Sequence, residues 1–199
     1  MSAEHGEGIL HILRIRAQAT PQQLAGALDA GEPEISAALV RLAEQGSVRD
    51  TGDPRTGWTT TRAGRRIAEE KMRDLPEDSA PVLEKAFEAF RALDEELKGL
   101  CADWQTRDAI KTGAKDFAPR LASVDDRAQA LLAEAVPAAG HFAPYAERLA
   151  KARKRFDGGA DSYLTGLTVD SYNTIWSECD ECFFITLGRS RQPDEASKP

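Results

Sequence analysis

The sequence predicts a mainly α-helical protein in two parts, with the boundary near residue 75. Three features support this prediction. Alanine is frequent, and apolar residues recur at steps of three and four over long stretches of the chain. Strand character is confined to two short stretches, near residues 48 and 58. The segment 75–81 is mostly polar and contains two prolines, which is typical of a linker.

At 199 residues the chain is long enough to bury a core. Its hydrophobic share of 41% and charged share of 30% are those of a globular protein rather than of a disordered chain. No apolar run approaches the about 20 residues that a membrane span needs, and the first residues lack the pattern of a secretion signal. We therefore expect a cytoplasmic protein that has no membrane partner.

The first part, 1–74, is expected to hold short helices and one hairpin. Thr20 is a helix N-cap followed by proline at the first helical position, and Gly46 is a helix stop. Turn residues between two short runs of strand character indicate a hairpin over 48–60. In chain order we expect helices at 9–17, 22–28 and 33–45, strands at 48–50 and 58–60, and a helix that Thr61 caps and that runs to about Arg73.

This order is that of a winged helix-turn-helix domain, in which the two strands form the wing. The sequence also resembles the MarR-like regulators over about 65 residues. The matching phrases are Leu42-x-x-x-Gly46-x-Val48, Asp53-Pro-Arg55 and Thr61-x-x-Gly64-Arg65. MarR-like proteins usually have a long helix before this unit, whereas only eight residues precede it here. The resemblance implies a bacterial DNA-binding transcription regulator whose dimer contacts lie elsewhere in the chain.

The second part, 82–191, is expected to form a bundle of about four helices, and 192–199 a disordered tail. The helices are predicted at 82–101, 125–136, 144–156 and 169–187. The phrases Leu100–Gln105, His141–Tyr145 and Asp170–Tyr172 resemble the helical domain attached to winged-helix proteins of a poorly characterised bacterial regulator family. The resemblance implies a regulator architecture and names no ligand.

Double-stranded DNA is the expected partner of the first part. Residues 9–73 carry ten Lys and Arg against eight Asp and Glu, although the whole chain has a net charge of −7. The helix that would enter the major groove offers Pro33, Glu34, Ser36, Ala37 and Arg41. The wing and the helix after it offer arginines for the minor groove and the phosphates, namely Arg49, Arg55, Arg62 and Arg65.

An alternative function follows from the charge of the same helix. Glu32 and Glu34 would face a polyanion, and the leading turn of the helix has no Arg, Lys, Asn or Gln. The domain would then be a scaffold that acts through protein contacts without binding DNA. If it does bind DNA, one mildly basic module buries too little surface for specificity, so we expect a homodimer that reads two half-sites.

A small effector is a further expected partner, bound between helices of the second part. Trp104, Tyr172 and Trp176 could line its site, and Arg107 could pair with a carboxylate on it. These aromatic residues could equally be ordinary core. If they do line a site, the aromatic rings and Arg107 together favour a partly apolar, acidic effector.

The remaining motifs predict neither catalysis nor a bound metal. Cys179-x-x-Cys182 lies within a predicted helix among acidic residues, which favours buried packing thiols over a zinc site or a redox pair. The three histidines have no spacing that suggests acid–base chemistry, and no phosphate-binding glycine loop or nucleophile motif is present. The sequence thus indicates a regulator without cofactors and not an enzyme.

Overall fold

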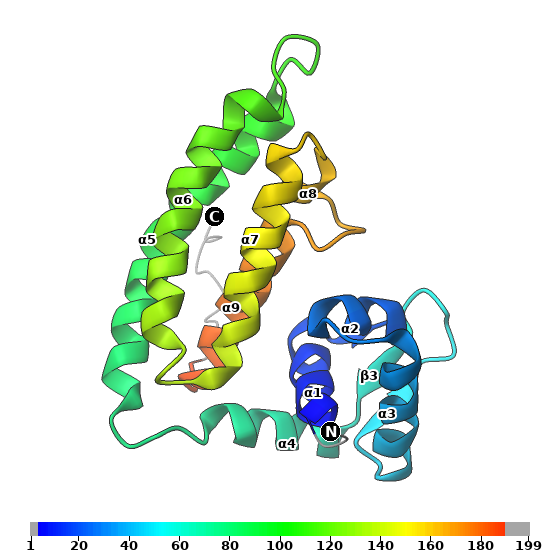
Figure 1. Ribbon diagram of the computed structural model, residues 1–199. Helices are drawn as coiled ribbons and strands as arrows, with labels where there is room; N and C mark the ends of the chain where they lie inside the picture. The colour runs from blue at the N-terminus through cyan, green and yellow to red at the C-terminus, as the bar shows by residue number, and fades with distance from the viewer. Residues whose placement is uncertain (1–3, 190–199) are drawn as a thin grey trace, which may run out of the picture.

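The computed structural model describes residues 4–189 and is mainly helical, with a small three-stranded antiparallel sheet (Figure 1). The N-terminal segment, 4–73, holds α1 (Glu4–Arg16), β1 (Gln18–Ala19), α2 (Pro21–Leu28), α3 (Glu32–Glu44), β2 (Val48–Asp50), β3 (Trp58–Thr60) and α4 (Arg62–Arg73). The C-terminal helices are α5 (Ser79–Thr106), α6 (Ala114–Ala135), the 3₁₀ helix η1 (Gly140–Phe142), α7 (Ala143–Asp157), α8 (Ser162–Thr165) and α9 (Tyr172–Thr186).

The elements of the N-terminal segment follow the predicted order, and local chemistry explains their ends. Thr20 and Gln23 form a capping box at the start of α2, in which each side chain bonds the other residue's backbone N–H. Thr61 caps α4 through a hydrogen bond from the Gly64 backbone N–H. A Cβ on Gly64 would lie 1.9 Å from the Ser47 carbonyl oxygen, so only glycine allows the start of α4 to pack against the segment between α3 and β2.

The sheet has one strand more than the sequence predicts. Its order is β1-β3-β2, with Gln18 opposite Thr59 and Arg49 opposite Thr59 on the other side. The additional strand, β1, follows directly after Ala17, whose φ of 65° turns the chain out of α1. Two residues are too few to give an alternating pattern, which is why the sequence does not reveal β1.

Four C-terminal helices, α5, α6, α7 and α9, pack around a shared core. Several are displaced from their predicted ranges. α5 begins at Ser79, inside the expected linker, and α6 begins at Ala114 rather than 125 because Phe117 and Leu121 extend its apolar face through Pro119. The predicted helix 169–187 is shorter, and α8 precedes it. The expected tail, 192–199, lies outside the described residues.

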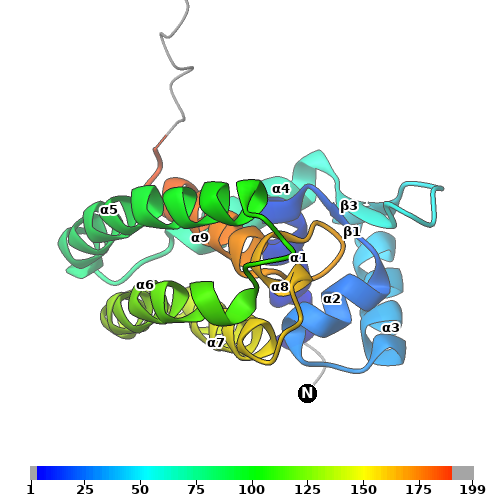
Figure 2. The ribbon, with the colours of Figure 1, turned by 90° about the horizontal axis from the view of Figure 1, so that it is seen from above.

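The two parts are packed tightly against each other. Figures 1 and 2 both show α1 between α3 and α9, and α1 and α4 contact α9. Met72, near the end of α4, belongs to the core of the C-terminal helices, and Ile15 packs against that core. Within residues 4–189, no helix combines the length and apolar character that crossing a membrane requires.

Candidate nucleic-acid interface

The helix α3 lies at the edge of the molecule that faces away from the C-terminal helices (Figure 1). Its buried side, with Ile35 and Leu39 at 0% exposure, packs against α1 and α2. The opposite side carries the residues predicted to meet DNA: Pro33, Glu34, Ala37 and Arg41 are exposed and Ser36 is half-buried. The amphipathic pattern of α3 therefore leaves this set accessible from solvent.

The loop 51–57 between β2 and β3 is held by its own hydrogen bonds. The Thr51 hydroxyl bonds the Thr56 hydroxyl at 2.7 Å and the Gly57 carbonyl at 2.8 Å. Arg55 projects from this loop with 88% of its side chain exposed, and its guanidinium donates two hydrogen bonds to Asp53. These bonds lower the pKa of Asp53 and raise that of Arg55. The arginine stays charged and its position at the loop is restrained.

The other arginines predicted to contact DNA, Arg41 in the major groove and the remainder at the wing and the helix after it, are also exposed. Within residues 4–189, none of Arg41, Arg49, Arg62 and Arg65 takes part in an ion pair, and Arg66 is 3.6 Å from Glu70. They come from α3, β2 and the start of α4, which the close contact of Gly64 with Ser47 brings together. Unpaired arginines of this kind are available to bind an anion without first breaking a salt bridge.

The carboxylates of Glu32 and Glu34 are exposed in the first turn of α3. Negative charge is favourable there because the N-terminal end of a helix carries partial positive charge. They also lie next to the surface that would approach DNA. The two carboxylates thus stabilise the helix that carries them. In a complex with a polyanion, the same carboxylates would repel the partner.

The residues predicted to bind an effector lie in the core of the C-terminal helices and have partners already. Trp104 packs edge-on against Phe117 and Phe156, with ring centroids 5.1 and 5.0 Å away. Arg107 covers the Trp104 ring at 3.2 Å from its centroid and donates a hydrogen bond to Asp161. An effector at this place therefore stays a prediction.

Tyr172 and Trp176, from α9, pack on a different side of that core. Trp176 stacks on Phe90 at 4.1 Å and donates a hydrogen bond to Asp94 at 3.0 Å, while the Tyr172 hydroxyl donates to Asp125. Neither these two residues nor Trp104 and Arg107 line the two cavities described for residues 4–189. Both side chains act as core in this arrangement.

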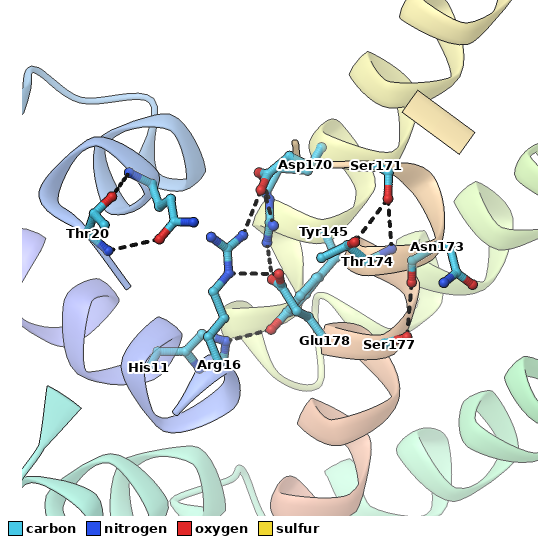
Figure 3. A network of polar contacts seen from close by, with 12 residues as sticks. His11, Arg16, Thr20, Tyr145, Asp170, Ser171, Asn173, Thr174, Ser177 and Glu178 are labelled. Carbon is cyan, nitrogen blue, oxygen red and sulfur yellow. Dashed lines mark hydrogen bonds and ion pairs between the residues drawn. The ribbon is translucent and has the colours of Figure 1, made fainter. Parts of the chain in front are cut away.

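A polar network at the junction between the two parts was not anticipated from the sequence. Arg16 of α1 and Arg148 of α7 share two carboxylates, Glu178 of α9 and Asp170 just before it (Figure 3). Three of the four side chains are nearly buried, with 12% of Arg16, 8% of Arg148 and 7% of Glu178 exposed. No short-range motif links these positions, so the sequence offers no signal for them.

Two histidines also meet at this junction. The ring centroids of His11 in α1 and His141 in η1 are 5.6 Å apart. His11 Nε2 is hydrogen bonded to the Tyr145 hydroxyl at 2.9 Å, and His141 Nε2 to the Thr186 hydroxyl at 2.8 Å. Burial lowers the pKa of His11 to about 3, with smaller contributions from His141 and Arg148, and burial lowers that of His141 to about 4. Both rings are therefore neutral at pH 7.

The three cysteines are buried and free, which confirms the predicted burial of Cys179 and Cys182. Burial raises the pKa of Cys101 to about 11 and is also the main reason that the pKa values of Cys179 and Cys182 lie above the usual range. The neighbouring carboxylates add to this effect. No group of three or more potential metal ligands occurs in the part of the chain that the structure describes.

Comparison with known proteins gives no relative for this chain. None of the protein-family models, the curated proteins or the solved structures shows a significant match.

Proposed function

We propose that this protein is a DNA-binding transcription regulator whose N-terminal segment acts as a winged helix-turn-helix domain. The observation that carries the proposal is a group of exposed arginines on α3, β2 and the start of α4 that have no ion pair among residues 4–189, namely Arg41, Arg49, Arg62 and Arg65. Arginine pairs with phosphate in a planar, two-bond geometry, and such contacts supply most of the affinity of DNA-binding proteins.

In the proposed complex, α3 lies in the major groove with Arg41 and Glu34 toward the bases. Arg55, which projects from the 51–57 loop, enters the adjacent minor groove, where its charge is attracted by the negative potential of narrow A·T-rich stretches. Arg49, Arg62 and Arg65 contact phosphates. The acidic first turn of α3 weakens non-specific binding, so affinity depends on the arginines and on salt.

The active form in this proposal is a cytoplasmic homodimer. Two copies can read half-sites about one helical turn apart, which one mildly basic module cannot do with useful specificity. The C-terminal helices, which pack around a large core of their own, provide the pairing surface. A monomer by sedimentation at micromolar concentration would remove this part of the proposal.

DNA binding is tested by fluorescence anisotropy with random duplexes and with DNA from upstream of the gene, at 50 and 200 mM salt. We expect binding at low salt that weakens by at least ten-fold at high salt. The double variant Arg49→Ala/Arg62→Ala should bind at least ten-fold more weakly than the unmodified protein. Arg91→Ala removes an exposed arginine of α5, away from α3, and should leave binding unchanged.

The acidic start of α3 supports a second candidate function, a scaffold that contacts proteins and not DNA. Glu32 and Glu34 are exposed, and the chain as a whole has a net charge of −7. If no duplex is retained even at 50 mM salt, and the double arginine variant behaves as the unmodified protein does, the scaffold function replaces the regulator.

A further inference from the structure

A cavity of about 520 Å³ lies between the N-terminal segment and the C-terminal helices. Its walls come from α1, α2 and α4 on one side and from η1, α7 and the chain before η1 on the other. Its size is within the range of about 300–1,000 Å³ that small-molecule sites occupy. Most of its lining is apolar, including Leu10, Leu28, Met72, Leu75, Ala139 and Pro144.

Two polar atoms of lining residues have no hydrogen-bond partner: one is Nη2 of Arg148, whose guanidinium is ion-paired with Asp170 and Glu178, and the other is a ring nitrogen of His11. His11 Nδ1 is buried and unpaired, whereas Nε2 of the same ring bonds the Tyr145 hydroxyl. Buried polar atoms are rarely left without a partner, because they have given up their bonds to water. Because His11 belongs to the lining, its unpaired nitrogen is a specific polar anchor for a ligand in a mostly apolar space.

The charged groups of the lining are already neutralised or lie at its exposed rim. Arg148 is bound by Glu178 and Asp170, and Lys71 is exposed and lies 3.5 Å from Glu7. The His11 and His141 rings are uncharged at neutral pH. A carboxylate brought into the cavity beside His11 would lose its hydration without gaining a free cation. The other carboxylates of the lining, Glu7 and Asp74, are exposed, so an ammonium group buried beside His11 would not reach them without staying at the rim.

We infer that this cavity is a binding site for an uncharged, mainly apolar molecule that carries one hydroxyl group. The apolar body would be buried against the aliphatic lining, and the hydroxyl would bond His11 Nδ1. A hydroxyl suits this atom in either ring tautomer, because it both donates and accepts hydrogen bonds. This ligand class differs from the acidic effector that the sequence suggested for the core around Trp104.

The site also has the position of a regulatory site, a consequence that rests on the proposed DNA binding. Its walls belong to both parts of the protein, so a molecule that fills it favours one placement of the N-terminal segment against the C-terminal helices. An occupied cavity would therefore change DNA affinity, and DNA would change ligand affinity by the same factor.

The test is calorimetric titration of the full chain with three probes of equal chain length, 1-octanol, octanoate and octylammonium. We expect 1-octanol to bind at one site, with the two charged probes at least ten-fold weaker. His11→Phe should reduce octanol affinity at least five-fold, whereas His5→Phe, the same change outside the cavity lining, should not alter it. Equal binding of the three probes, or no binding of octanol to the folded chain, would overturn the inference.

Even if His11→Phe does not fold, the three probes on the unmodified protein still show whether the cavity prefers an uncharged ligand. DNA affinity is measured separately by anisotropy, with and without saturating octanol. Octanol binding without DNA binding would reject the proposed function and keep the site. DNA binding without octanol binding would reject the site alone.

Discussion

Arg16 and Glu178 are 162 positions apart in the sequence, and the Arg16 Nε donates a hydrogen bond of 2.7 Å to a carboxylate oxygen of Glu178. Arg148 donates to the other oxygen of the same carboxylate, also at 2.7 Å. Glu178 thus joins the N-terminal segment to two of the C-terminal helices. Because these charged groups have lost most of their hydration, each is stabilised mainly by the opposite charges beside it.

Glu178→Gln should destabilise the protein strongly. The change leaves two nearly buried guanidinium groups with Asp170 alone, and breaking a buried ion pair costs about 3–5 kcal/mol. Urea denaturation gives the free energy of unfolding. Glu96→Gln is the matched control, since its partner Arg127 lies at the surface, and it should cost much less. Equal losses in the two variants would contradict this account of the junction.

Gly64→Ala and Gly99→Ala should change stability in opposite directions. A Cβ at Gly64 meets the Ser47 carbonyl at 1.9 Å, so the contact between α4 and the segment before β2 must open, at about 1–3 kcal/mol. Gly99 lies in α5 with open space around its Cβ position, and alanine there should stabilise the helix by about 0.5–1 kcal/mol. Melting temperatures of the two variants test the sign of each effect.

Trp176→Ala should cost about 3–5 kcal/mol of unfolding free energy. The ring is 2% exposed, stacks on Phe90 and donates a hydrogen bond to Asp94, so truncation leaves a cavity and removes that hydrogen bond. Trp58→Ala, at a half-buried ring in β3, should cost less in the same denaturation experiment. A small loss at Trp176 would indicate that the indole forms the wall of a pocket instead.

Arg55→Ala should reduce the preference for A·T-rich duplexes as well as overall affinity. The side chain projects from the 51–57 loop and is 88% exposed, and arginine is attracted to narrow minor grooves. Anisotropy with an A-tract duplex and a G·C-rich duplex of equal length measures the ratio of affinities. Arg91→Ala should leave that ratio as it is. An unchanged ratio in Arg55→Ala would place the 51–57 loop outside the minor groove.

Acid should destabilise the junction through His11 and His141. Their pKa values in the folded state, about 3 and about 4, lie below the ordinary value of 6.5. Below pH 6.5 the unfolded chain therefore binds protons at these histidines that the folded chain does not bind. Their contribution is complete above pH 6.5 and is lost as the pH falls toward 4. The double variant His11→Gln/His141→Gln should show a flatter decline of stability between pH 7 and 4, measured in urea at each pH. If stability falls equally steeply with pH in the double variant and in the unmodified protein, the two histidines are not the cause of the acid sensitivity.

The order of the helices and of the β2–β3 hairpin over 4–73 follows from local chemistry, and the sequence predicts it, whereas it does not predict β1. Caps such as Thr20 and Thr61, and the apolar spacing of Ile35, Leu39 and Leu42, act over a few residues and leave a direct pattern. The exposure of the arginines around α3 and the hairpin follows from the same patterns, since amphipathic elements turn charged side chains outward. The burial of Cys179 and Cys182 was predictable for the same reason.

Only the tertiary structure decided what the junction contains. His11 meets His141, and Arg16 meets Glu178, because the N-terminal segment packs on α9 and α7, and no sequence period links residues so far apart. The same packing leaves the cavity beside His11. The packing of the C-terminal helices on one another places Arg107 against Trp104 and Asp161. Local propensities act over one or two helical turns, whereas cavities and buried ion pairs depend on how whole helices approach one another.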